Sequence, residues 1–209
     1  MKTAITSLVF DFGGVLSRPQ QPACVRDIMD MLGLDGSVER FRSVYFARRI
    51  AYDRGSVTVR EYWEGICGEL GIELPEASLP AIIDRDNDAW FQYRPEMIEV
   101  IASLKRRTRK IALLSNINVE SVVRFRATFP RLDLFDHMTF SCDVGLMKPE
   151  KAIFEHCFRS IGARPEDCLF VDDTPENVVG ARAAGMHALR FIDERNFLAE
   201  LETFYDIFR

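Results

Sequence analysis

Two kinds of hydrophobic pattern alternate along the chain. A continuous apolar run at 5–10 (ITSLVF) ends at Asp11 and a pair of glycines, which is typical of a buried parallel strand followed by a tight loop. From about residue 17 to residue 93, apolar positions recur at helical spacing instead, and Thr58 and Glu61 have the spacing of a capping box. The apolar helix faces include Val25, Ile28, Met29 and Leu32, then Phe41, Val44 and Tyr45, then Tyr62, Ile66, Cys67 and Leu70. We expect this stretch to be entirely helical.

From residue 94 onward, short apolar runs alternate with helical patterns. Strands are predicted at 111–114, 138–140, 168–171 and 187–191, and helices at 95–106, 119–129, 149–161 and 175–184. This alternation predicts an α/β fold: a doubly wound, Rossmann-like parallel sheet with an all-helical insert after the first strand. We therefore expect a core formed by residues 1–16 and 94–209 and a helical cap formed by residues 17–93.

Composition and charge narrow the classes of protein. The 209 residues are 47% hydrophobic and 28% charged, which is ordinary globular usage. The net charge of −5 disfavours a nucleic acid or an anionic membrane as partner. No apolar run approaches the ~20 residues of a membrane-spanning helix, and the first residues do not resemble a signal peptide. We expect a cytoplasmic protein, and the sequence says nothing about its oligomeric state.

The cysteines do not indicate a metal site. Five cysteines are scattered along the chain without a C-x-x-C pair, and the three histidines lack ligand spacing. We expect reduced thiols and no structural zinc. The positive charges of the run 105–110 are interpreted as stabilising the C-terminus of the preceding helix, not as a nucleic-acid binding patch.

Polar residues follow the predicted strands in four places. Each has an ordinary interpretation as a turn former or helix cap. The carboxyl ends of parallel strands, however, meet at one crevice, so residues at successive strand ends are expected to lie together. The four clusters are Asp11, Ser115-Asn116, Lys148 and Asp172-Asp173.

Three carboxylates, a hydroxyl and an ammonium in one crevice point to phosphate chemistry. Carboxylates held close together repel one another unless a cation lies between them, and an all-oxygen ligand set suits Mg²⁺. The hydroxyl of Ser115, the ammonium of Lys148 and backbone N–H groups can bind phosphate oxygens. With the phosphate neutralised, the carboxylate of Asp11 can attack phosphorus and form an aspartyl-phosphate.

These motifs resemble those of the haloacid dehalogenase (HAD) superfamily, whose phosphatases have a nucleophilic Asp in a D-x-D-G motif after the first strand. The resemblance extends over nearly the whole chain and implies a hydrolase that acts on a small phosphorylated substrate. It implies that Asp11 is the nucleophile, that Ser115 and Lys148 are catalytic, and that Ser115, Asn116 and Lys148 bind substrate.

The resemblance also implies a Mg²⁺ site, and it is here that the sequence departs from the family pattern. The implied ligands are Asp11, the carbonyl of Gly13 and Asp173, with Asp172 either a direct ligand or a support. Gly13 stands where most members have a second Asp, so the side chain that acts as acid and base is missing. Its loss costs about 10²- to 10⁴-fold in rate. The sequence is also similar to a branch resembling glucose-1-phosphate phosphatases, which implies a substrate such as a sugar 1-phosphate.

Two other functions are compatible with the motifs. A haloacid dehalogenase also uses an Asp nucleophile but needs no metal, and the acidic pair Asp172-Asp173 argues against it. A catalytically weak binding protein would account for Gly13, although the other site residues are all present. Substrate choice is expected to lie on the inner face of the cap. The aromatic and basic candidates there are Tyr45, Phe46, Arg48, Arg49, Tyr52, Arg54, Trp90 and Tyr93.

Overall fold

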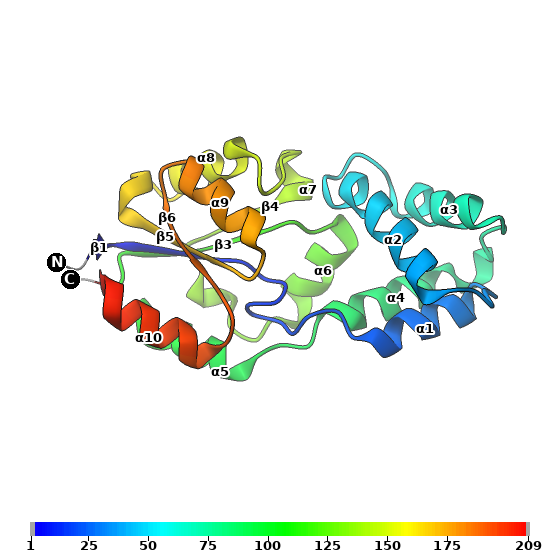
Figure 1. Ribbon diagram of the computed structural model, residues 1–209, viewed down its shortest axis with the longest axis horizontal. Coiled ribbons are helices and arrows are strands. Elements are labelled where there is room, and N and C mark those ends of the chain that lie inside the picture. The colour runs from blue at the N-terminus through cyan, green and yellow to red at the C-terminus, as the bar shows by residue number, and fades with distance from the viewer. Residues whose placement is uncertain (1–2, 208–209) are drawn as a thin grey trace.

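The core is a five-stranded parallel sheet with helices on both faces (Figure 1). The computed structural model describes residues 3–207. The strands follow the spatial order β4-β3-β2-β5-β6. They are β2 (Ser7–Phe10), β3 (Lys110–Ser115), β4 (His137–Phe140), β5 (Cys168–Asp172) and β6 (His187–Arg190). The predicted doubly wound α/β class is thereby confirmed.

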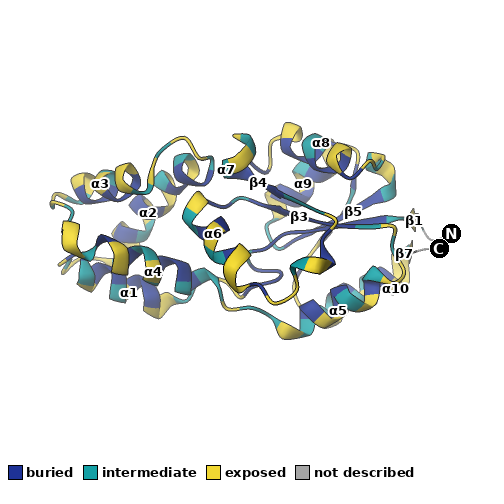
Figure 2. Ribbon diagram, turned by 180° about the vertical axis from the view of Figure 1, so that it is seen from behind, coloured by how far each residue is buried: buried dark blue, intermediate teal, exposed yellow. Residues whose placement is uncertain are grey.

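The central strand β2 is buried on both faces, which explains its continuous apolar run. Leu8 and Phe10 pack into one apolar cluster with helices α5 (Pro95–Lys105), α6 (Val119–Thr128) and α10 (Glu194–Phe204). Val9 packs into a second cluster with α8 (Lys151–Ser160) and α9 (Pro175–Ala183) on the other face. Figure 2 shows the strands as buried and the exposed positions on the outer sides of the helices.

The insert after β2 is all-helical, as predicted, and lies at the far end of the molecule from α10 (Figure 1). It contains α1 (Pro22–Met31), α2 (Val38–Asp53), α3 (Val59–Leu70) and α4 (Leu79–Trp90). The capping box of Thr58 and Glu61 is present at the start of α3. These four helices, which we call the cap, enclose a third apolar cluster of their own. Among the described residues, no helix combines the length and the hydropathy needed to traverse a bilayer.

Two segments connect the cap to the core and pair with each other. Ser17 and Tyr93 form an isolated antiparallel bridge. The N–H of Arg18 donates to the carbonyl of Gln92 at 2.8 Å, and the N–H of Arg94 donates to the carbonyl of Leu16 at 2.8 Å. The entrance and exit of the cap are therefore held together beside the ends of the sheet strands.

Three features differ from the sequence prediction. The first apolar run is divided at Thr6 into β2 and a separate strand β1 (Thr3–Ile5), because the carbonyl of Thr6 bonds to the N–H of Arg109 and its N–H to the carbonyl of Asp167. β1 pairs with β7 (Tyr205–Ile207) in a two-stranded parallel sheet. Helix α10 and the short helix α7 (Ser141–Val144) were not predicted. The other core elements agree with the prediction to within two residues, and all five cysteines are free.

Candidate active site

The strand-end residues lie side by side at one edge of the sheet. Asp11 directly follows β2, Ser115 is the last residue of β3, and Asp172 is the last residue of β5. Strands β3 and β5 flank β2, and Phe10 is in register with Val171. The N–H of Asp11 also donates to the carbonyl of Val171 at 2.9 Å. Parallel pairing of these strands thus places the three polar residues next to one another.

Lys148 connects two of these carboxylates. Its ammonium lies 2.6 Å from Oδ1 of Asp11 and 2.7 Å from Oδ2 of Asp172. Burial alone would lower the pKa of Lys148, but the two carboxylates outweigh burial and raise it. The side chain therefore carries a fixed positive charge at the floor of the site.

The loop that carries Lys148 is fixed by Asn116. The side-chain amide of Asn116 donates to the carbonyl of Lys148 at 2.9 Å, and its oxygen accepts from the N–H of Lys148 at 2.9 Å. Both polar groups of this side chain are thereby engaged. The neighbouring Ser115 is buried and lines the same cavity. Since the amide of Asn116 is engaged, the hydroxyl of Ser115 is the side-chain group of the two that can bind a ligand.

Negative charge exceeds positive charge at this edge. The carboxylates of Asp11, Asp172 and Asp173 each place an oxygen within 4.8 Å of the others. Burial and the charge of Asp172 raise the pKa of Asp11, and Lys148 offsets only part of this. Burial and Asp172 likewise raise the pKa of Asp173. The residues therefore fit a second, hard cation with oxygen ligands such as Mg²⁺.

The two adjacent acids are not equivalent. Asp172 is fully buried, and its oxygens accept from Lys148, from the N–H of Thr174 at 2.8 Å and from the amide of Asn177 at 3.0 and 3.1 Å. Asp173 is partly exposed and lines the cavity, with one contact at 3.3 Å to the hydroxyl of Thr174. Asp173 is thus free to bind a cation directly, whereas Asp172 is occupied in orienting Lys148.

Two glycines after Asp11 have different roles. Gly14 has a φ of +77°, and a Cβ built on it would lie 2.2 Å from Oδ2 of Asp173. Gly13 has no positive φ, and a Cβ there would meet only Trp90 of the cap, at 4.0 Å. Gly14 therefore lets Asp173 approach the loop, whereas the space beside Gly13 is open and faces an indole ring.

The site opens into a cavity of about 640 Å³ between core and cap. Its core side contains Asp11, Ser115, Lys148 and Asp173. The cap and its connecting segments contribute the apolar residues Pro19, Phe46, Trp90 and Phe91 and the polar or charged residues Gln20, Arg42, Arg49 and Asp53. A cavity of this size has room for an organic group attached to a phosphate.

Three of the eight cap candidates line the cavity, namely Phe46, Arg49 and Trp90. The other five have partners elsewhere. Arg48 pairs with Glu69, Tyr52 donates to Glu120, Arg54 pairs with Glu150, Tyr93 shares a hydrogen bond with Thr128, and Tyr45 is in the apolar cluster of the cap.

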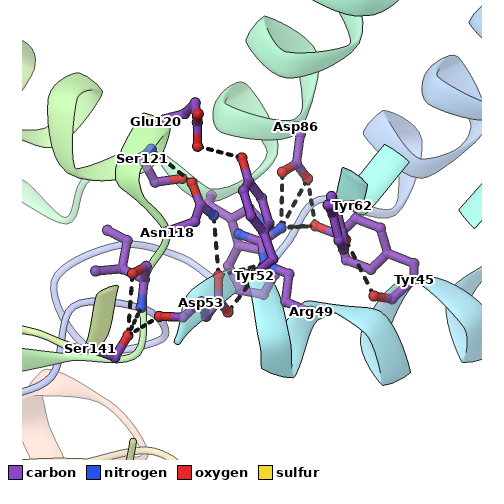
Figure 3. Close-up of polar contacts among 12 residues, drawn as sticks. Tyr45, Arg49, Tyr52, Asp53, Tyr62, Asp86, Asn118, Glu120, Ser121 and Ser141 are labelled. Atoms are coloured by element: carbon purple, nitrogen blue, oxygen red, sulfur yellow. Dashed lines mark hydrogen bonds and ion pairs between the residues drawn. The ribbon is translucent and has the colours of Figure 1, made fainter. Parts of the chain in front are cut away.

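Arg49 is held by a buried network that reaches the core (Figure 3). Its guanidinium lies 3.1 Å from Oδ1 of Asp53 and 2.9 Å from Oδ2 of Asp86. Tyr45 donates to Asp86 at 2.5 Å, and the amide of Asn118 in the core donates to Asp53 at 3.1 Å. The charge of Arg49 is thus compensated within the protein.

Sequence reasoning missed several residues of the site. Asn177 had a readable signal, because it lies in the first turn of a helix that directly follows the acidic pair. Gly14 was visible only as one member of a glycine pair. Gln20, Arg42 and Asp53 carry no motif, and only the packing of the cap onto the core brings them to the cavity.

Comparisons with known proteins find a matching family model and relatives that cover most of the chain. A family model described as haloacid dehalogenase-like hydrolase matches residues 5–185. A sesquiterpene phosphatase, astK, of Aspergillus oryzae is 25% identical over 201 residues, which cover 96% of this chain and 97% of that protein. The phosphatase MT3486 of Mycobacterium tuberculosis is 26% identical over 192 residues, which cover 88% of this chain and 86% of that protein.

A solved structure shares the fold. The HAD family enzyme bt-2542 of Bacteroides thetaiotaomicron, in complex with magnesium and inorganic phosphate, superimposes with a TM-score of 0.77. The match has 20% identity and covers 92% of this chain and 98% of that enzyme.

Proposed function

The chain belongs to the haloacid dehalogenase-like hydrolases, and on that premise we propose that it is a Mg²⁺-dependent phosphomonoesterase for a small phosphorylated metabolite. One observation carries the proposal. The carboxylates of Asp11, Asp172 and Asp173 share one edge of the sheet with a single ammonium, that of Lys148, at the floor of a cavity. Such a site favours a hard cation together with a phosphate.

Asp11, the carbonyl of Gly13 and Asp173 would hold the cation. Asp172 would support them by fixing Lys148, since its oxygens are already occupied. When bound, Mg²⁺ would neutralise the negative charge on the phosphoryl oxygens. The fit rests on the three carboxylates, whose oxygens lie within 4.8 Å of one another. Burial and the charge of Asp172 raise the pKa of Asp11 and of Asp173, and a bound cation would favour their ionised forms.

The side chains of the site account for the chemistry of phosphoryl transfer. Oδ1 of Asp11 accepts from the N–H of Phe12 at 2.7 Å and contacts Lys148, which leaves Oδ2 to attack phosphorus. The P–O ester bond breaks, and the leaving oxygen departs with the electron pair. Lys148 and the hydroxyl of Ser115 bind phosphoryl oxygens, and water then attacks phosphorus to release phosphate and restore Asp11.

The leaving group should depart without a proton from the residue at position 13. Gly13 has no side chain to donate one, so esters of acidic alcohols, such as sugar 1-phosphates, are favoured. The rings of Phe46, Trp90 and Phe91 line the cavity, so we propose a leaving group with an apolar face, as the CH face of a sugar has.

Dehalogenation is the less favoured alternative. It would require the excess negative charge at Asp11, Asp172 and Asp173 to persist without a cation, which burial makes costly.

The experiment is hydrolysis of p-nitrophenyl phosphate with Mg²⁺ and with EDTA, alongside halide release from 2-chloropropionate. We expect Mg²⁺-dependent phosphate release, and a loss of at least about 10⁴-fold in kcat for Asp11→Asn. Asp133→Asn, a change of an exposed carboxylate, is the matched control and should leave kcat unchanged. Phosphate release by Asp11→Asn at the wild-type rate, or halide release without metal, would contradict the proposal.

A further inference from the structure

Gln20 lines the cavity and carries a hydrogen-bond donor that has no partner among the described residues. The Nε2 atom of Gln20 is buried and makes no hydrogen bond to any described residue. Its orientation is fixed, because Oε1 of the same amide accepts from Nη1 of Arg42 at 3.1 Å. An unpaired buried N–H is unfavourable, so an acceptor is expected at this position.

Arg42 differs from the other two cations of the cavity. Lys148 and Arg49 each lie between two carboxylates, so their charge is compensated. Arg42, by contrast, has no ion pair within residues 3–207. Its described contacts are the one with Gln20 and one with the ring of Phe46, whose centre is 5.0 Å from the guanidinium carbon. Arg42 thus presents uncompensated positive charge next to the unpaired amide.

An apolar surface adjoins this pair. Phe46 and Trp90 pack edge to face with centroids 6.5 Å apart, and both line the cavity. Phe46 remains 38% exposed although it is large and apolar. Trp90 also stands over the space beside Gly13, close to the nucleophile loop. The cavity therefore combines the carboxylate cluster, the aromatic rings of Phe46 and Trp90, and the guanidinium of Arg42 beside the neutral amide of Gln20.

We propose that Gln20 and Arg42 form a specificity subsite for an anionic oxygen group, a carboxylate or a second phosphate, carried by the leaving group of the substrate. Phe46 and Trp90 pack against the apolar part between the two anionic groups. The inference rests on the proposed phosphomonoesterase activity and names its substrate class: phosphate monoesters with a second anionic group beyond an apolar segment.

The test uses phenyl phosphates that carry a carboxylate on a para tether of increasing length, each compared with its methyl ester. A remote charge leaves the acidity of the phenol nearly unchanged, so the ratio of the two kcat/KM values reports recognition alone. A parallel series with a tethered phosphate distinguishes the two anions. The variants are Arg42→Met and Gln20→Leu, and Arg48→Met is the matched control, because Arg48 lies on the same helix but pairs with Glu69.

At the best tether length, we expect wild type to prefer the anion over the ester by at least about tenfold, which corresponds to about 1.4 kcal/mol. Arg42→Met should abolish the preference and Gln20→Leu should reduce it, with each variant's own hydrolysis of plain phenyl phosphate as the reference. Arg48→Met should keep the preference.

Three results would overturn the inference. The first is an absence of preference at every tether length, with phenyl phosphate still hydrolysed. The second is a preference that survives Arg42→Met. The third is an absence of hydrolysis of any phenyl phosphate by wild type, which would refute the phosphomonoesterase proposal and this inference with it.

Discussion

Replacing Gly14 by alanine should remove the cation site while the fold persists. The added Cβ would lie 2.2 Å from Oδ2 of Asp173, whereas ordinary contacts begin near 3.4 Å, so the carboxylate must retreat by about 1 Å. Metal sites tolerate deviations of only about 0.2 Å in ligand distance. The φ of +77° adds about 1–2 kcal/mol of strain for a residue with a side chain. We expect Mg²⁺ affinity to fall by about 100-fold, or about 2.7 kcal/mol.

Calorimetric titration of the protein with Mg²⁺ measures this directly, without reliance on turnover. Gly13→Ala is the matched control, because a Cβ there meets only Trp90 at 4.0 Å and the backbone has no positive φ. Its Mg²⁺ affinity should stay within about threefold of wild type. Circular dichroism should show both variants folded. If Gly14→Ala binds Mg²⁺ as tightly as Gly13→Ala, the role assigned to the close approach of Asp173 is wrong.

Three further changes have defined outcomes. Gly13→Asp should raise kcat/KM for alkyl phosphates by about 10²-fold and leave p-nitrophenyl phosphate nearly unchanged, because only the poor leaving group needs a proton; equal effects on both esters would contradict this. Arg49→Met should lower the free energy of unfolding in urea by about 3–5 kcal/mol, because two buried carboxylates lose their cation. Arg48→Met removes the more exposed ion pair with Glu69 and should lower the free energy of unfolding by less than about 1 kcal/mol. Equal losses in the two variants would refute the argument. Burial raises the pKa of Cys142 to about 12. Its alkylation by iodoacetamide near pH 8, measured by mass spectrometry, should therefore be about 10³-fold slower than that of free cysteine. The rate should rise about tenfold per pH unit as the thiolate forms. A rate like that of free cysteine would contradict the raised pKa.

The site residues on the core side were predictable, because the end of each apolar run fixes the position of the residue that follows the strand. An apolar run that stops at Asp11, and another that stops at Asp172, place both residues at the same edge of any parallel sheet. The same reasoning placed Ser115 and Lys148 at that edge, and the resemblance of the motifs then implied their roles. Helix α10 could also have been predicted, since Asp193 caps it and apolar residues recur along it.

The cap side was less predictable. Tyr45 and Phe46 are adjacent aromatic residues on one helix, yet Tyr45 packs inside the cap and Phe46 lines the cavity. Helical spacing identifies an apolar face but does not say whether that face meets a neighbouring helix or a ligand. The ion pairs of Arg49 depend on how the cap helices pack on one another, because Asp53 lies on the same helix and Asp86 lies on α4. The break at Thr6 depends on hydrogen bonds from residues far along the chain.

The separation of the apolar clusters has a thermodynamic consequence. Two clusters flank the sheet and the third lies wholly inside the cap, whereas Asn118, Ser121 and Arg124 connect core to cap through hydrogen bonds and an ion pair. Separating the cap from the core would therefore break hydrogen bonds and an ion pair while each apolar cluster stays whole. Salt screens an exposed pair such as that of Arg124 with Asp88, so the contact between the two units should weaken as ionic strength rises.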